Sequence, residues 1–209
     1  MPSKTDWRLW LPPRKSLTPE LRKRLGDLLA SLPPHHVPPP RWMWPRLRDP
    51  KQWETIEIPL GGTQLKGRQE VVRLERWVLE ILQLGAGEVP IRVLAHGDGK
   101  GRFYVIVSHP AINRMLSENG YSTNSALLAP MILTLVGLAD VDGRTQFLDR
   151  NPFNLSIFNL TVRLFPRTPE GDEARRMRGA IFVARELLRR AEDAEAARWN
   201  RDGGCDAEG

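Results

Sequence analysis

A stretch of sixteen residues, from Phe147 to Val162, constrains the fold more than any other part of the chain. It begins with apolar Phe-Leu and ends with Leu-Thr-Val, and both ends favour strands. Between them an Asp-Arg-Asn-Pro sequence places Asx residues beside a proline, a combination that favours hydrogen-bonded turns. Asparagine side chains can also bond to neighbouring backbone groups. We therefore expect a strand, a turn and a second strand or loop, with Asn151, Asn154 and Asn159 as structural residues of the turn.

The same stretch resembles the HNH nuclease family, in the branch that is common among phage and mobile-element homing endonucleases. The motif of that branch reads roughly His-His-Ile-Asp-Gly-Asn-Pro-Leu-Asp-Asn-Arg, two variable residues and Asn-Leu-Arg-Val. The order of elements expected over residues 55–107 is also loosely similar to the front half of these proteins. The positions that fit the motif are Leu148, Asp149, Asn151, Pro152, Asn154, Asn159, Leu160 and Val162.

The resemblance fails at the two histidines, whose positions are occupied here by Gln146 and Phe147. A histidine suits the role of general base because its pKa lies near neutral, and HNH chemistry also needs a divalent metal. Neither glutamine nor phenylalanine can take up a proton at neutral pH. The resemblance therefore implies a catalytically degenerate HNH-like domain, in which Phe147, Phe153 and Phe158 fill the space of a metal site.

Two weak catalytic candidates remain. Asp149, with Asp140 or Asp142, could ligate Mg²⁺ in a rebuilt active site, but the same aspartate can instead cap the Asn-Pro turn. His109 is the other candidate, because nothing else in residues 51–167 could replace the missing base, although a lone histidine after a strand is more often structural. We expect no catalytic residue, no bound metal and no cofactor, with Mg²⁺ required only in the nuclease alternative.

The net charge of +6 is concentrated near the N-terminus. Residues 1–50 hold ten lysines and arginines and four acids, whereas the other 159 residues hold 21 of each sign. A basic segment on a neutral body suits a polyanion such as nucleic acid, or else simply keeps the chain in solution. Tryptophans that alternate with arginines can stack on bases or dock a linker onto the body. The nucleic-acid contacts that we expect are Arg41, Trp42, Trp44, Arg46, Arg48, Arg150 and Arg163.

The expected fold class is α+β, with a small β-rich core that contains an HNH-like ββα unit, an extended N-terminal arm with a short helix, and a long C-terminal helix. The proline-dense residues 33–50 should run extended. Strands are expected at 56–60, 69–74, 89–95 and 102–107, and helices at 19–31, 77–83, 110–119, 129–137 and 172–199. The expected organisation is a basic Trp/Pro-rich arm and linker at 1–50, the core at 51–167, an Arg-rich helix at 168–199 and a disordered tail at 200–209.

Composition narrows the class of protein further. No run of eighteen apolar residues could span a membrane, and the N-terminus lacks the apolar core of a signal peptide. The single cysteine, Cys205, excludes an intramolecular disulfide and a cysteine-built zinc site. We therefore expect a cytoplasmic protein without membrane contact. The apolar stripe of the last helix, from Met177 to Ala191, favours packing or dimerisation over DNA contact.

The expected function is binding of nucleic acid, double-stranded DNA in the first instance, without cleavage, as in a regulator from a phage or mobile element. Phosphate contacts would dominate the affinity and make it depend on salt. One alternative is an interaction or inhibitor module whose tryptophans and arginines anchor an acidic protein partner. The other is a metal-dependent DNA endonuclease with a rebuilt active site.

Overall fold

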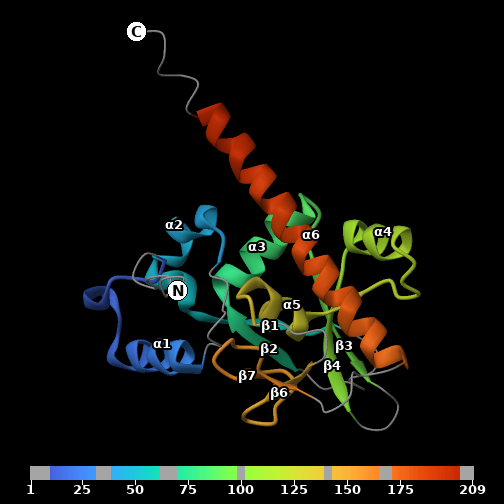
Figure 1. Ribbon diagram of the computed structural model, residues 1–209, viewed down its shortest axis with the longest axis horizontal. Coiled ribbons are helices and arrows are strands. Elements are labelled where there is room, and N and C mark those ends of the chain that lie inside the picture. Colours follow the sequence, from blue (N-terminus) through green and yellow to red (C-terminus); the bar gives the residue numbers. More distant parts are fainter. Residues whose placement is uncertain are drawn as a thin grey trace, which may run out of the picture.

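The computed structural model describes residues 10–31, 39–61, 70–97, 102–138, 143–164 and 171–202. Small antiparallel sheets and several helices form these ranges, so the expected α+β class is confirmed (Figure 1). The helices are α1 (Pro19–Ser31), α2 (Trp44–Leu47), α3 (Arg76–Ala86), α4 (Pro110–Glu118), α5 (Leu128–Leu135) and the long α6 (Gly171–Asp202). Short 3-10 turns lie at Arg14–Ser16, Arg41–Met43 and Pro50–Trp53.

All the strand pairs within the described ranges are antiparallel. The first sheet pairs β1 (Thr55–Pro59) with β2 (Val71–Glu75). The second has the order β3 (Arg92–Gly97), β4 (Phe103–Ser108) and β5 (Ala126–Leu127). The third pairs β6 (Gly143–Phe147) with β7 (Leu160–Leu164). Single bridges from Gly61 to Leu94 and from Arg73 to Asn154 tie the first sheet to β3 and to the loop between β6 and β7.

Helix α1 has the bounds that the sequence predicts, residues 19–31. The Thr18 Oγ1 accepts a hydrogen bond from the Leu21 backbone N–H at 3.2 Å, and Pro19 occupies the first helical position, which needs no N–H donor. The C-terminal helix is longer than predicted, because α6 continues past residue 199 to Asp202. The rest of the predicted tail, residues 203–209, lies outside the described residues.

The prediction that the proline-dense segment runs extended is wrong from Arg41 onward, although Pro40 directly before it has an extended backbone. From Arg41 to Trp53 the chain forms two 3-10 turns and the short helix α2, with Pro45 and Pro50 in first-turn positions that tolerate proline. Met43 and Leu47 are fully buried in the same core as Trp53. Burial of these large side chains gives the segment a reason to fold onto the body despite its prolines.

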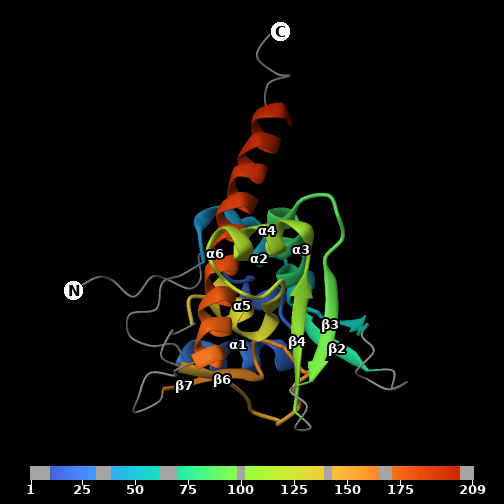
Figure 2. The ribbon, with the colours of Figure 1, turned by 90° about the vertical axis from the view of Figure 1, so that its right-hand side faces the viewer.

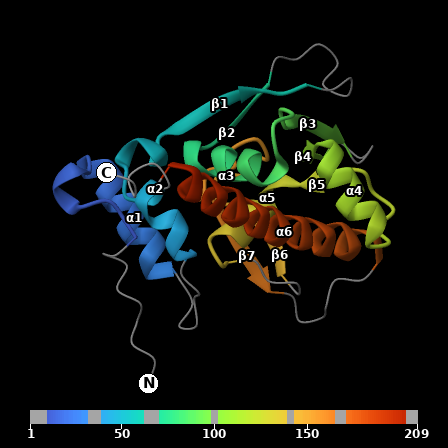
Figure 3. The same ribbon diagram turned by 90° about the horizontal axis from the view of Figure 1, so that it is seen from above.

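The core lies where α6 crosses α3 and α5, seen from above in Figure 3. The crossing with α3 is closest at Gly85, where a Cβ atom would lie 2.0 Å from the carbonyl oxygen of Leu187. A glycine is required there because no side chain fits between the two backbones. The apolar stripe predicted for α6 is the face that packs on this core, with Ala180, Ala184 and Leu187 fully buried.

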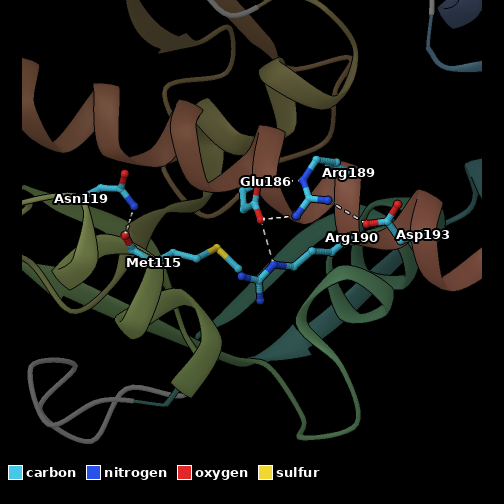
Figure 4. Close-up of polar contacts among 6 residues, drawn as sticks. All are labelled: Met115, Asn119, Glu186, Arg189, Arg190 and Asp193. Atoms are coloured by element: carbon cyan, nitrogen blue, oxygen red, sulfur yellow. Dashed lines mark hydrogen bonds and ion pairs between the residues drawn. The ribbon is translucent and has the colours of Figure 1, made fainter.

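The surface of α6 carries an ion-pair cluster (Figure 4). Glu186 accepts hydrogen bonds from Arg189 and Arg190, and Arg189 also pairs with Asp193 at 2.8 Å. The hydrogen bond from Arg189 is the main reason that the pKa of Glu186 falls to about 2. Figure 4 also shows the C-terminal end of α4. There the Asn119 Nδ2 caps the helix by donating a hydrogen bond to the Met115 carbonyl oxygen at 2.9 Å.

The last turns of α6 project away from the body (Figures 1 and 2). From Glu192 to Arg201 no described side chain is buried, and Trp199 is 79% exposed. Among the residues that the structure describes, no helix has the length and apolar character needed to cross a membrane.

Candidate nucleic-acid interface

Strands β6 and β7 form a two-stranded ribbon at the lower edge of the molecule in Figures 1 and 2. Directly opposed residues lie on the same face of an antiparallel pair. Phe147 lies opposite Leu160, and both pack against the core. The ribbon therefore has an apolar inner face and a polar, basic outer face. The opposed pairs on the outer face are Gln146 with Thr161 and Arg144 with Arg163.

The loop that joins the two strands is held by its own side chains. The Arg150 N–H donates to the Phe147 carbonyl oxygen at 3.1 Å and closes a β-turn. The Asn159 Oδ1 accepts from the Asp149 N–H at 2.9 Å, while its Nδ2 donates to the Asp149 Oδ1 at 2.9 Å and to the Asn154 carbonyl oxygen at 2.7 Å. Asn159 is only 7% exposed, so these bonds also satisfy an almost buried amide.

The other two asparagines bond within the same loop. The Asn154 Nδ2 donates to the Asp149 Oδ2 at 2.6 Å, and the Asn151 Oδ1 accepts from the Phe153 N–H at 3.0 Å. Every asparagine that the sequence singles out for the turn thus contacts another group of that turn.

The carboxylate of Asp149 accepts hydrogen bonds from the asparagines of this loop. It also accepts from the Asn151 N–H at 2.8 Å, so both carboxylate oxygens have donors. Desolvation raises the pKa of Asp149, but the hydrogen bonds from Asn154, Asn151 and Asn159 outweigh it and hold the pKa below its ordinary value. Asp140 and Asp142, its suggested partners for Mg²⁺, lie outside the described residues. Within the described ranges, no group of three or more His, Cys, Asp or Glu side chains could hold a metal ion.

The loop is also anchored to β2. The Leu155 N–H donates to the Arg73 carbonyl oxygen at 2.7 Å, and the Arg73 N–H donates to the Phe153 carbonyl oxygen at 2.9 Å. Two residues further along β2, Glu75 is fully buried. Its carboxylate accepts from the Ser156 Oγ at 2.5 Å and from the Ile157 N–H at 2.9 Å. Burial raises the pKa of Glu75, and these two donors partly offset that effect.

Helix α1 also contacts this loop, at Ser156 and Phe158. The Arg24 guanidinium donates to the Ser156 Oγ at 3.1 Å and lies 4.2 Å from the centre of the Phe158 ring. An open groove of about 610 Å³ runs between α1 and the loop. Its lining includes Arg24 and Asp27 from α1, Arg73 from β2, and Leu148, Asp149, Phe158 and Thr161 from the ribbon and its loop.

Arg150 and Arg163 are the predicted contact residues that the ribbon carries, and both are exposed. Arg150 has a φ of 62°, a left-handed conformation that is uncommon for a residue other than glycine. Neither arginine forms an ion pair with any residue in the described ranges. Arg144, which lies opposite Arg163, is bonded to Glu173 at the start of α6.

The five predicted contact residues between 41 and 48 have a different environment. Arg46 forms ion pairs at 3.5 Å with Glu80 of α3 and with Glu195 of α6. Trp42 and Trp44 are partly buried against the core, and the Trp44 Nε1 donates to the Pro39 carbonyl oxygen at 2.8 Å.

Of these five residues, only Arg41 and Arg48 are exposed. The segment lies near α3 and the projecting end of α6, whereas the β6–β7 ribbon lies at the lower edge in both views (Figures 1 and 2). The structure therefore does not bring the seven predicted contacts together; it divides them between two surfaces.

His109, the weak candidate for a catalytic base, lies at the start of α4 and is 5% exposed. Its Nδ1 accepts from the Ala111 N–H at 3.0 Å, which leaves the proton on Nε2, and Nε2 lies 2.9 Å from the Val89 carbonyl oxygen. Both ring nitrogens are therefore engaged, Nδ1 in capping α4 and Nε2 in contacting the loop before β3. In Figure 1, α4 lies well away from strands β6 and β7.

Sequence reasoning missed Glu75 and its bonds to Ser156 and Ile157. The available signal was an acid that ends the apolar run Val-Val-Arg-Leu-Glu and directly precedes an apolar helix, a position where burial is plausible. It also missed the packing of Arg24 on this loop, because nothing local in α1 distinguishes that arginine from its basic neighbours.

No protein-family model, curated protein or solved structure matches the chain. The resemblance to the HNH family therefore remains a prediction that rests on residues 146–162.

Proposed function

We propose that the protein binds double-stranded DNA without cleaving it, through the outer face of the β6–β7 ribbon and its loop. The observation that carries the proposal is the pair of exposed arginines, Arg150 and Arg163, on a ribbon whose loop is fixed by internal hydrogen bonds. Two-stranded antiparallel ribbons fit a DNA groove, and arginines on their edges bind phosphates. Arg144, directly opposite Arg163, lies on the same face, where its charge is paired with Glu173.

Binding without cleavage is supported by the groups that occupy the catalytic positions of the resemblance. Gln146 lies on the outer face and cannot act as a base at neutral pH, and Phe147 packs against the core. Phe153 and Phe158 also pack against the core. Asp149, the remaining acidic candidate, has donors on both of its oxygens. In this proposal the loop between β6 and β7, which corresponds to the catalytic loop of the HNH family in the resemblance, serves as a rigid support for DNA contacts. The protein would then act as a cytoplasmic regulator of phage or mobile-element type.

The proposal is tested by titrating a short fluorescent duplex with the full chain at low and higher salt. We expect the affinity to fall at least tenfold between about 50 and 200 mM salt, because released counterions drive phosphate binding. The absence of binding at the lower concentration would contradict the proposal. Incubation of plasmid DNA with Mg²⁺ or Mn²⁺ tests the second half, and we expect no nicking. Nicking that Asp149→Ala abolishes would establish the nuclease alternative instead.

One observation favours the rival function, a module that binds a protein partner. Trp199 is 79% exposed on the projecting end of α6, and large exposed aromatic side chains often anchor interfaces. The acids Glu195 and Glu192 lie about one and two turns before it in the helix. The variant Trp199→Ala separates the two functions, since loss of a captured protein partner with unchanged DNA affinity would favour the rival.

A further inference from the structure

Leu148 is a large apolar side chain held out into solvent at the tip of the ribbon. It is 68% exposed, whereas its neighbour Phe147 packs against the core. A single exposed leucine on a flexible surface would need no explanation. Leu148 differs from such a residue because it lies in a turn whose backbone is hydrogen-bonded to Asn159.

The backbone on both sides of Leu148 is fixed. The Leu148 N–H donates to the Asn159 carbonyl oxygen at 2.9 Å, and the Asp149 N–H donates to the Asn159 side chain at 2.9 Å. The β-turn bond from Arg150 to Phe147 encloses Leu148 from the other side. These bonds fix the backbone that carries Leu148, and on that backbone its apolar side chain is exposed.

The charges around Leu148 identify the kind of surface that would cover it. Arg150 is exposed two residues away, and the exposed Arg163 lies on the outer face of the same ribbon. Of the nearby acids, Asp149 directs its carboxylate at amide donors of the loop, and Asp27 of α1 lines the same groove as Leu148 together with Arg24 and Arg73. An apolar tip between cations matches duplex DNA, in which apolar base faces stack between two rows of phosphates.

Resting on the proposed function, we propose that Leu148 is a wedge that inserts between two stacked base pairs when the ribbon enters a groove of duplex DNA. Leucine is among the side chains that proteins insert between base steps, and such insertion unstacks the step and kinks the duplex. The ligand is thus DNA that is bent on binding. Arg150 and Arg163 contact phosphates beside the kink, and the rigid turn supplies the stiffness that a wedge needs.

The assignment differs from the stacking role predicted for the tryptophans. Trp42 and Trp44 are partly buried against the core and lie on the other predicted surface, with Arg41 and Arg48. Leu148 is the large apolar side chain that the described part of the ribbon exposes beside its arginines.

The test uses the full chain and a duplex that carries a fluorophore at each end and 2-aminopurine in the centre. Energy transfer between the ends reports bending, the 2-aminopurine signal reports unstacking, and anisotropy reports binding. We expect the wild-type protein to increase both of the first two signals. Leu148→Ala should bind with the same salt slope and an affinity at most about tenfold weaker, but lose both signals, whereas Leu148→Met should retain them.

The matched control is Val89→Ala, which truncates another exposed apolar side chain, 52% exposed, in the loop before β3. It should leave all three signals unchanged. Wild-type binding without bending or unstacking, or equal signals from wild type and Leu148→Ala, would overturn the wedge and leave the proposed function intact. Failure of the wild-type protein to bind any duplex would overturn both.

Discussion

Two basic segments of this chain, residues 41–48 and the ribbon with its loop at 143–164, each carry three arginines together with aromatic residues but are packed differently. In the first, Arg46 is tied to two other helices and both tryptophans pack against the core. In the second, the inner face is apolar, and Arg150 and Arg163 form no ion pair within the described ranges and are exposed. Each segment therefore keeps two exposed arginines, Arg41 and Arg48 in the first and Arg150 and Arg163 in the second, but packing removes Arg46 and both tryptophans from the first set. Packing therefore decides which basic groups are available to a ligand.

This difference changes how the role of the N-terminal region must be tested. Removing residues 1–50 would take away Trp10, Leu11, Met43 and Leu47, all of which are buried in the main core. Such a truncation would lose binding through unfolding, whatever the binding site. Point substitutions at exposed residues separate folding from ligand contact.

The largest expected effect tests whether the first segment belongs to the core. Met43 is fully buried, so Met43→Ala should reduce the free energy of unfolding by about 2–5 kcal/mol. Urea denaturation measures this loss, and the exposed Arg48→Ala serves as the control, with a change within about 0.5 kcal/mol. Equal stabilities of the two variants would mean that the segment is a detachable arm.

The next largest effect concerns the turn that supports the ribbon. Asn159→Ala removes three hydrogen bonds at an almost buried position and should cost about 2–3 kcal/mol of unfolding free energy. Asn151→Ala is the matched substitution, because Asn151 uses its side chain for one exposed bond to the Phe153 N–H. We expect it to cost less than about 1 kcal/mol. If the two asparagines prove equally important in denaturation experiments, the turn is not held as described.

A smaller effect is expected at Arg46, because its ion pairs are long and partly solvated. The pairs with Glu80 and Glu195 each measure 3.5 Å, and the Arg46 side chain is 24% exposed. Arg46→Ala should cost about 1 kcal/mol or less. A double-mutant cycle with Glu195→Ala measures the coupling between α2 and α6, and a coupling energy of zero would remove this contact from the account.

The smallest expected effect is the pH dependence contributed by Asp149. Its pKa in the folded protein lies below the ordinary value of 3.8. The charged carboxylate therefore adds stability above pH 3.8, and that contribution is lost as the pH falls from 3.8 through the lower pKa of the folded state. Asp149→Asn should flatten the loss of stability in this acid range, as followed by urea midpoints at a series of pH values. A steeper loss in the variant would contradict the sign of the shift.

Much of the fold follows from local patterns, and the turn of the ribbon is the clearest example. Asp149, Asn154 and Asn159 bond to one another within ten residues, so residue type and spacing are enough to predict their role. Glu75 and Ser156 are 81 positions apart, and Arg24 and Ser156 are 132 apart. Nothing in the local sequence of α1 or β2 indicates those contacts.

Besides these long-range contacts, local patterns could not predict which side chains are exposed to solvent. Trp42 and Trp44 alternate with arginines as a base-stacking segment would, but they are placed by the core residues Met43 and Leu47 beside them. Conversely, Leu148 fits an apolar position of the motif and yet is exposed, because the turn bonds fix its backbone. Both outcomes depend on how distant elements pack.

The most direct test of the central claim compares the salt dependence of DNA binding for two double variants. In Arg150→Ala/Arg163→Ala, the slope of log affinity against log salt should become shallower by about 1.8, since each lost phosphate contact removes about 0.9. In Arg41→Ala/Arg48→Ala the slope should equal that of the wild-type protein. The reverse result, with an unchanged slope in the ribbon variant and a shallower slope in the other, would place the DNA contacts on residues 41–48 and contradict the account.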